Sequence, residues 1–115
     1  MEKFSYKTQY GNYENCFFRV GKYPNGNIAI SIISEDDGPI THCTTNTGMK
    51  LSDDRIVVKY WSENEGMEEF LIQMGIIEPD PCDIDINSPM TPDIYKLTEK
   101  GINLIKEQLS WINVQ

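Results

Sequence analysis

The sequence predicts an α+β fold: a curved, mainly antiparallel sheet of five or six strands, with one helix near residues 62–74 and a C-terminal helix near residues 98–112. Three observations support this prediction. Apolar and polar residues alternate through the first 60 residues, helical periodicity replaces this alternation after residue 62, and a second helical stripe follows near the C-terminus. With 115 residues and 39% apolar content, the chain is expected to form a single domain over residues 1–115.

The N-terminal half is typical of a β meander. Predicted strands lie at residues 4–6, 16–20, 28–33, 40–45 and 55–60. Segments rich in glycine, proline, asparagine or aspartate separate most of these strands and predict turns. In the third strand, Ile28, Ile30 and Ile32 alternate with residues that include a further isoleucine, so we expect a central strand with both faces partly covered.

The first helix has a start signal and a stop signal. Ser62 and Glu65 have the S-x-x-E spacing of a capping box. Gly75 stands where a glycine commonly ends a helix. Between these signals, one apolar helical stripe contains Met67, Phe70, Leu71 and Met74.

The C-terminal third begins with a Glu-Pro-Asp-Pro segment at residues 78–81, which excludes helix and central strand. Alternation at residues 83–87 predicts a short edge strand whose acids discourage edge-to-edge pairing. The last helix begins either at Thr98 or at Thr91-Pro92. Its apolar stripe contains Ile102, Ile105, Leu109 and Ile112.

The motifs of the sequence predict no catalytic, cofactor-binding or metal-binding residue. Residues 83–87 imitate the first ligands of an EF-hand, but Ser88 and Ile94 replace the required glycine and glutamate. His42 and Cys43 would point to opposite faces of a strand. No flanking motif supports pairing His42 with Cys16 or Cys82, although a small enzyme built on these groups stays an alternative. We therefore expect a protein that is not an enzyme.

The bulk properties predict a cytoplasmic protein. The three cysteines are odd in number and widely spaced, which argues against a disulfide framework and indicates a reducing compartment. No apolar run approaches the roughly 20 residues that span a bilayer, and no signal-peptide segment follows Met1.

Acidic residues are concentrated in the middle of the chain. Between residues 35 and 93, fourteen Asp or Glu stand against Lys50, Arg55 and Lys59, within a chain of net charge −8. Such a field repels nucleic acid directly and attracts basic protein surfaces. The residues predicted to bind a partner are Glu63, Glu65, Glu68, Glu69, Asp53, Asp54, Asp36 and Asp37. The alternative is an inert acidic domain, with a solvated surface that serves solubility and a structural or self-assembly role.

Residues 95–101 followed by Leu104 and Ile105 resemble the segment from wing strand to last helix in bacterial winged-helix regulators. That resemblance would imply three helices before the segment and a basic face that reads DNA. The preceding residues are predicted mostly as strands, and the chain is acidic. A winged-helix-like regulator is therefore the alternative to a protein-binding function.

A second resemblance covers residues 10–77. Residues 21–30 with Asp37-Gly38-Pro39, and residues 51–54 leading through 57–58 to 68–71 and 75–76, resemble a family of small bacterial proteins carried largely on phage and mobile elements. That family has no assigned function, so the resemblance implies no catalytic residue. Small acidic proteins of phage and mobile elements often resemble inhibitors of host nucleases, so the resemblance and the acidity together lead us to expect an inhibitor of a host nuclease or CRISPR effector, of anti-restriction or anti-CRISPR type. A homodimer through a sheet edge or the last helix is a further expectation.

Overall fold

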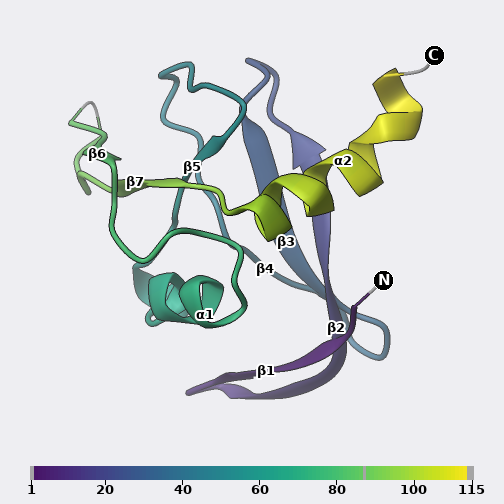
Figure 1. Ribbon diagram of the computed structural model, residues 1–115. Helices are drawn as coiled ribbons and strands as arrows, with labels where there is room; N and C mark the ends of the chain where they lie inside the picture. Colours follow the sequence, from purple (N-terminus) through teal and green to yellow (C-terminus); the bar gives the residue numbers. More distant parts are fainter. Residues whose placement is uncertain (1, 87, 114–115) are drawn as a thin grey trace.

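The α+β class is confirmed in the computed structural model, which describes residues 2–86 and 88–113, with side chains up to Leu109. The large antiparallel sheet has the order β1-β2-β3-β4, with bounds β1 Phe4–Thr8, β2 Gly11–Lys22, β3 Ile28–Ser34 and β4 Gly38–His42. The small sheet has the order β5-β7-β6, with bounds β5 Arg55–Val57, β6 Asp83–Ile84 and β7 Asp93–Lys96. The helices are the 3₁₀ turn η1 Ser62–Asn64, α1 Met67–Gln73 and α2 Glu99–Asn113 (Figure 1).

The large sheet follows the alternation of the sequence. Cys16, Phe18 and Val20 of β2 are buried on the same face as Ile28, Ile30 and Ile32 of β3. The opposite face of β3 is half-buried, and β3 pairs with β2 on one side and β4 on the other. The prediction of a central third strand with both faces partly covered is therefore confirmed.

The strands form two sheets instead of one. The predicted fifth strand pairs over only three residues, and beyond it Val58 makes an isolated bridge to Thr44. The partner of β5 is β7, a strand that the sequence pattern does not predict. Because β7 has four residues and follows a turn-rich loop, its alternation is too short to stand out from the sequence.

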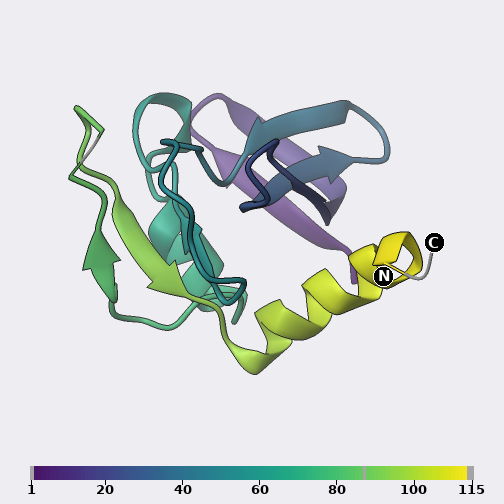
Figure 2. The same cartoon turned by 90° about the horizontal axis from the view of Figure 1, so that it is seen from above.

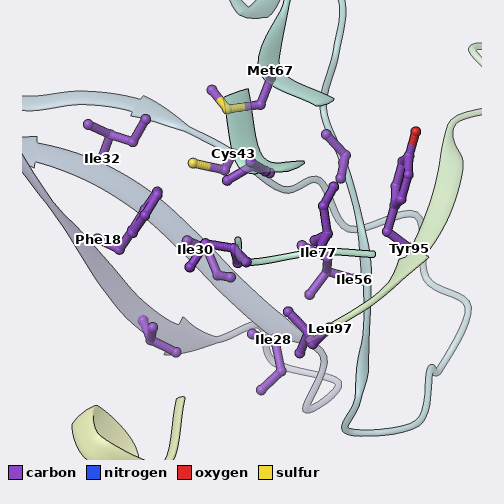
Figure 3. Packing of buried hydrophobic residues seen from close by; sticks show 14 of the residues in the cluster. Phe18, Ile28, Ile30, Ile32, Cys43, Ile56, Met67, Ile77, Tyr95 and Leu97 are labelled. Carbon is purple, nitrogen blue, oxygen red and sulfur yellow. The ribbon is translucent and has the colours of Figure 1, made fainter. Parts of the chain in front are cut away.

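The core lies between the two sheets. In Figure 3, Ile28 and Ile30 lie toward Ile56, Ile77 and Leu97, while Ile32 lies farther along β3, and Met67 of α1 adds a further buried side chain. An aromatic group extends this core where α1 meets β1 and β2. Its ring centroids lie 4.7–5.6 Å apart for the pairs Phe4–Phe18, Tyr6–Phe70 and Phe4–Phe70.

The predicted helix at 62–74 begins later than its capping box indicates. Ser62 has φ +59° and Gly66 has φ +89°, and no side-chain cap is formed, so α1 starts only at Met67. The reason is Asn64, which is fully buried and donates through its amide to the carbonyls of His42 and Lys59. This anchoring holds residues 62–66 against β4 and prevents a regular first turn.

The end of α1 is as predicted. Gly75 has φ +76°, and its N–H donates to the carbonyl of Ile72, while the N–H of Ile76 donates to that of Leu71. These two bonds are a Schellman motif, which satisfies the last carbonyls of the helix. Met67 and Leu71 are fully buried, so the predicted apolar stripe faces the core.

The start of α2 is resolved in favour of Thr98. Its hydroxyl oxygen accepts a hydrogen bond from the N–H of Gly101 at 3.0 Å, as an N-cap does. Thr91 instead has φ +42° in a loop. At Gly101 the helix passes so close to the Ile76 carbonyl that a Cβ would collide with it. Leu109 is buried and Ile102 and Ile105 are half-buried, while the side chain of Ile112 lies outside the described residues.

α2 also covers part of the open edge of β2. The Gln108 side-chain amide accepts a hydrogen bond from the Val20 N–H at 2.8 Å and donates to the Phe18 carbonyl at 2.6 Å. These are the backbone groups that β1 leaves unpaired, because β1 pairs with β2 only as far as Cys16.

The helices of the described residues bear on two classes of protein, membrane-spanning proteins and winged-helix regulators. No helix in the described part of the chain is long and apolar enough to cross a bilayer. Before β7, the described residues form one α-helix and one 3₁₀ turn, so the three helices that a winged helix requires are not formed there.

Candidate functional site

Negative charge is concentrated on one side of the fold. Residues 60–95 contain nine Asp or Glu and no Lys, Arg or His. This segment forms η1, α1, β6 and β7, which lie together in two perpendicular views, while α2 lies on the other side (Figures 1 and 2). We call residues 60–95 the acidic side.

Two of the predicted contact residues on the acidic side, Glu65 and Glu69, are exposed. Glu63 is exposed as well, but it forms an ion pair with Lys59 at 2.8 Å. The hydrogen bond from Lys59 is the main cause that lowers the pKa of Glu63 to about 2. Because Glu65 precedes α1, the expected four-residue spacing of Glu65 and Glu69 on one helix is not formed. The charge of Glu63 is therefore paired with that of Lys59, whereas Glu65 and Glu69 form no ion pair within the described residues.

Glu68 is partly buried and belongs to a cluster that the sequence did not indicate. It accepts a hydrogen bond from the Tyr95 hydroxyl, and the Asp93 carboxyl lies beside it. Burial, opposed by the Tyr95 bond and reinforced by Asp93 and Glu69, raises the pKa of Glu68. Burial and the same carboxylates also raise the pKa of Tyr95. Glu68 thus connects α1 to β7.

The other predicted residues lie elsewhere. Asp53 is 3.9 Å from Lys50 and lines a hollow beside α2 with Lys22 and Lys106. Asp54 accepts a hydrogen bond from Ser52 at 2.7 Å, which is the main cause that lowers its pKa. Nearby lysines therefore offset the negative charge of this loop.

Asp36 and Asp37 form the turn between β3 and β4. Their N–H groups donate to the Ser34 hydroxyl, and the Asp36 carboxylate accepts from Asn15 at 3.2 Å. Both views place this turn at the far end of the large sheet from α1 (Figures 1 and 2). The eight predicted carboxylates thus occupy three separate regions.

At β6 and directly after it, one carboxylate is buried and two isoleucines are exposed, opposite to the usual preference of these side chains. Asp85, which follows the strand, is fully buried, whereas Ile84 and Ile86 are 50% and 81% exposed. The Asp85 carboxylate accepts a hydrogen bond from Thr47. The Asp83 carboxylate accepts the N–H of Ile84 at 2.8 Å. The edge position of residues 83–84 is confirmed, and Asn87 lies outside the described residues.

The cysteines and the histidine do not assemble a nucleophile. Cys16 and Cys43 are buried, and burial raises the pKa of both thiols, which opposes formation of a thiolate. Cys82 is exposed. As expected, His42 points away from Cys43: it is exposed, and its Nδ1 lies 2.9 Å from the Ser31 hydroxyl across the β3–β4 pair.

The Ser31–His42 pair was not anticipated from the sequence. It lies in a groove of about 540 Å³ on the outer face of the large sheet, near Arg19 and Tyr23. Nucleophile activation needs a further group that orients the base. Within the described residues, no carboxylate is hydrogen-bonded to the other ring nitrogen of His42. The pair is a cross-strand contact between β3 and β4, where Ser31 and His42 stand opposite each other.

Searches for similar proteins add no assignment. No protein-family model matches the chain, and no curated protein or solved structure matches it. Among residues 2–86 and 88–113, no three His, Cys, Asp or Glu side chains are arranged to hold a metal ion.

Proposed function

We propose that this is a non-enzymatic protein that binds a basic protein surface through its acidic side. The observation that carries the proposal is the segregation of charge: nine carboxylates and no cation within residues 60–95, in elements that lie together. Uncompensated carboxylates destabilise a small domain by mutual repulsion. A partner that supplies Lys and Arg would remove this repulsion on binding.

The contact residues in this proposal are Glu65 and Glu69, with Glu63 and Glu68 beside them. Glu63 can exchange Lys59 for a cation of the partner, since exposed ion pairs are weak. The two other regions, at residues 36–37 and 53–54, contribute to the long-range field. Such fields accelerate encounter with a basic partner, and salt screens them.

The proposed partner class is a nucleic-acid-targeting enzyme. A channel lined by Lys and Arg attracts phosphates, and carboxylates at similar spacing compete for the same cations. Together with the resemblance to mobile-element proteins, this favours an inhibitor of a nuclease or CRISPR effector. We place this action in the cytoplasm, because all three cysteines are free thiols, as expected in a reducing compartment.

The test begins with a pull-down from a bacterial lysate that contains restriction and CRISPR systems, eluted in steps of salt. The affinity of the purified partner is then measured for two charge-matched variants. We expect E65K/E69K to weaken binding about tenfold and flatten its salt dependence, since two exposed ion pairs contribute roughly 0.5–1 kcal/mol each. D36K/D37K carries the same change of charge at the other end of the sheet, and we expect a smaller effect.

Equal losses in the two variants would show that only net charge matters and would contradict a binding face on the acidic side. Unchanged affinity in both variants would show that these carboxylates do not contribute to binding and would contradict the proposal, and a pull-down that recovers no partner would favour an inert acidic surface. Binding of duplex DNA by the wild type at low salt would instead favour the alternative of a regulator.

A further inference from the structure

The acidic side also carries exposed apolar residues. Ile84, Ile86 and Met90 are 50%, 81% and 41% exposed, and they lie within seven residues on β6 and the loop that joins β6 to β7. Elsewhere in the described chain, Tyr10 in the β1–β2 turn is the other large hydrophobic residue with comparable exposure, at 71%. Clustered apolar residues with a polar surround are typical of protein-binding surfaces.

This exposure opposes stability. Burying an isoleucine side chain contributes about 1.5–3 kcal/mol, and burying a carboxylate is unfavourable unless it is hydrogen-bonded. A shift of one residue in the register of β6 would turn the isoleucines inward and Asp85 outward. The structure adopts the opposite arrangement. Such local conflicts with stability are expected where a protein functions.

Hydrogen bonds hold the described residues on either side of position 87 in this arrangement. The N–H of Asp85 donates to the Pro92 carbonyl at 2.9 Å, and the N–H of Thr91 donates to the Ser88 carbonyl at 2.9 Å. The Tyr60 hydroxyl donates to the Met90 carbonyl at 3.2 Å. Together with the bond from Thr47 to the Asp85 carboxylate, these contacts hold Asp85, Met90 and Thr91, which adjoin or belong to the exposed group. A preformed surface loses less entropy on binding.

The contact is made through side chains. Addition of a partner strand would need free backbone groups along β6, but the Asp83 carboxylate already accepts the N–H of Ile84. The apolar side chains beside it are available.

We propose that Ile84, Ile86 and Met90 form the apolar anchor by which a basic protein docks on the acidic side, its apolar pocket framed by Lys or Arg. This inference rests on the proposed function and specifies its partner. Charge complementarity supports it, because the exposed acid Asp83 directly precedes Ile84, the exposed acid Asp80 lies four residues before it, and residues 60–95 contain no cation. A second copy fits poorly, since a twofold contact would bring the same carboxylates together.

The probe is an amphipathic peptide of Lys and Leu, compared with a peptide in which Ser replaces each Leu. Binding to the full chain is followed by NMR of the Ile and Met methyl groups. We expect the Leu peptide to shift the methyls of Ile84, Ile86 and Met90 and to bind about tenfold more tightly than the Ser peptide. I86S should weaken binding of the Leu peptide about fivefold, whereas the control Y10S should leave it unchanged.

Both substitutions replace exposed side chains, so the fold should be retained, and unchanged methyl shifts elsewhere verify this. Equal affinity for the two peptides, or an equal loss in I86S and Y10S, would overturn the anchor.

Other outcomes separate the anchor from the proposed function. If E65K/E69K still weakened the binding of both peptides, the proposed function would stand without the apolar anchor. If only I86S weakened binding and salt had no effect, the charge-based function would fail and the apolar contact would remain. Self-association that I86S abolishes would replace the basic partner with a second copy.

Discussion

At Glu68 a carboxylate lies between a phenol and another carboxylate. The Glu68 carboxylate accepts a hydrogen bond from the Tyr95 hydroxyl, and the nearby carboxylates of Asp93 and Glu69 oppose its ionisation. Burial and these two acids keep its pKa above the ordinary value in the folded state. A raised carboxyl pKa stabilises the folded protein below the ordinary pKa, and this stabilisation is lost as pH rises through the folded value. At neutral pH the charge of Glu68 is therefore unfavourable.

We expect Glu68→Gln to stabilise the protein at pH 7.5. The glutamine oxygen still accepts from Tyr95, while its amide can donate to Asp93. Since the side chain is partly exposed, solvent screening limits the gain to less than about 1 kcal/mol. Urea unfolding at pH 7.5 and at pH 4 measures the effect, which should shrink at the lower pH because the wild-type carboxyl then binds a proton. A variant that is less stable at both values would contradict this account.

On the scale of elements, the two helices differ in how they begin. Thr98 caps α2 through the N–H of Gly101, and its hydroxyl also reaches the Gly75 and Ile76 carbonyls that follow α1. The residue with the corresponding sequence signal at the first helix, Ser62, makes no cap bond.

We therefore expect Thr98→Ala to lower the free energy of unfolding by about 1–2 kcal/mol, since a lost N-cap typically costs about 1 kcal/mol and two carbonyls also lose a partner. Ser62→Ala is the matched control and should cost at most a few tenths of a kcal/mol. Chemical denaturation of both variants measures the difference. A larger loss for Ser62→Ala would show that the capping box forms after all.

The edge of β2 depends on a side chain from the far end of the chain. Gln108 bonds both the Val20 N–H and the Phe18 carbonyl. Gln108→Ala should destabilise the protein by about 1–2 kcal/mol, because two backbone groups lose their partners. Hydrogen exchange at the Val20 amide should accelerate, whereas exchange at Ile30, in the centre of the large sheet, should change only with global stability. Unchanged protection of Val20 would contradict the role of Gln108.

On the scale of the whole molecule, repulsion among the acids dominates the electrostatics. The net charge is −8, and within the described residues the ion pairs involve Glu2, Glu35, Asp53 and Glu63, all on exposed or partly exposed side chains. Exposed ion pairs contribute little to stability. Screening should therefore weaken the repulsion more than it weakens these pairs.

We expect the melting temperature to rise by several degrees between low salt and about 0.5 M NaCl, where the Debye length falls to a few ångströms. The increase should be smaller in E65K/E69K, whose net charge is reduced. Scanning calorimetry in NaCl measures this, and KCl controls for the identity of the cation. A melting temperature that falls with salt would show that ion pairs outweigh repulsion.

Much of the fold could be predicted because its signals are local. The alternation of Ile28, Ile30 and Ile32 and the stripe from Met67 to Met74 each report a periodicity of the backbone itself. The arrangement of the candidate site was harder to predict from the sequence. Glu65 and Glu69 were correctly expected to be exposed, but the compensation of Asp53 by lysines and the bond from Tyr95 to Glu68 depend on residues far apart in the chain.

The sequence by itself determined the α+β class, the core-facing residues of β2, β3 and α1, the glycine end of α1 and the acidity of the central segment. Tertiary structure decided the division into two sheets, the break between η1 and α1, and the burial of Asp85 beside the exposed Ile86. The physical reason is the range of the interactions. Periodicity and turn residues act over a few neighbours, whereas strand partners, register and the environment of each carboxylate depend on which distant surfaces meet.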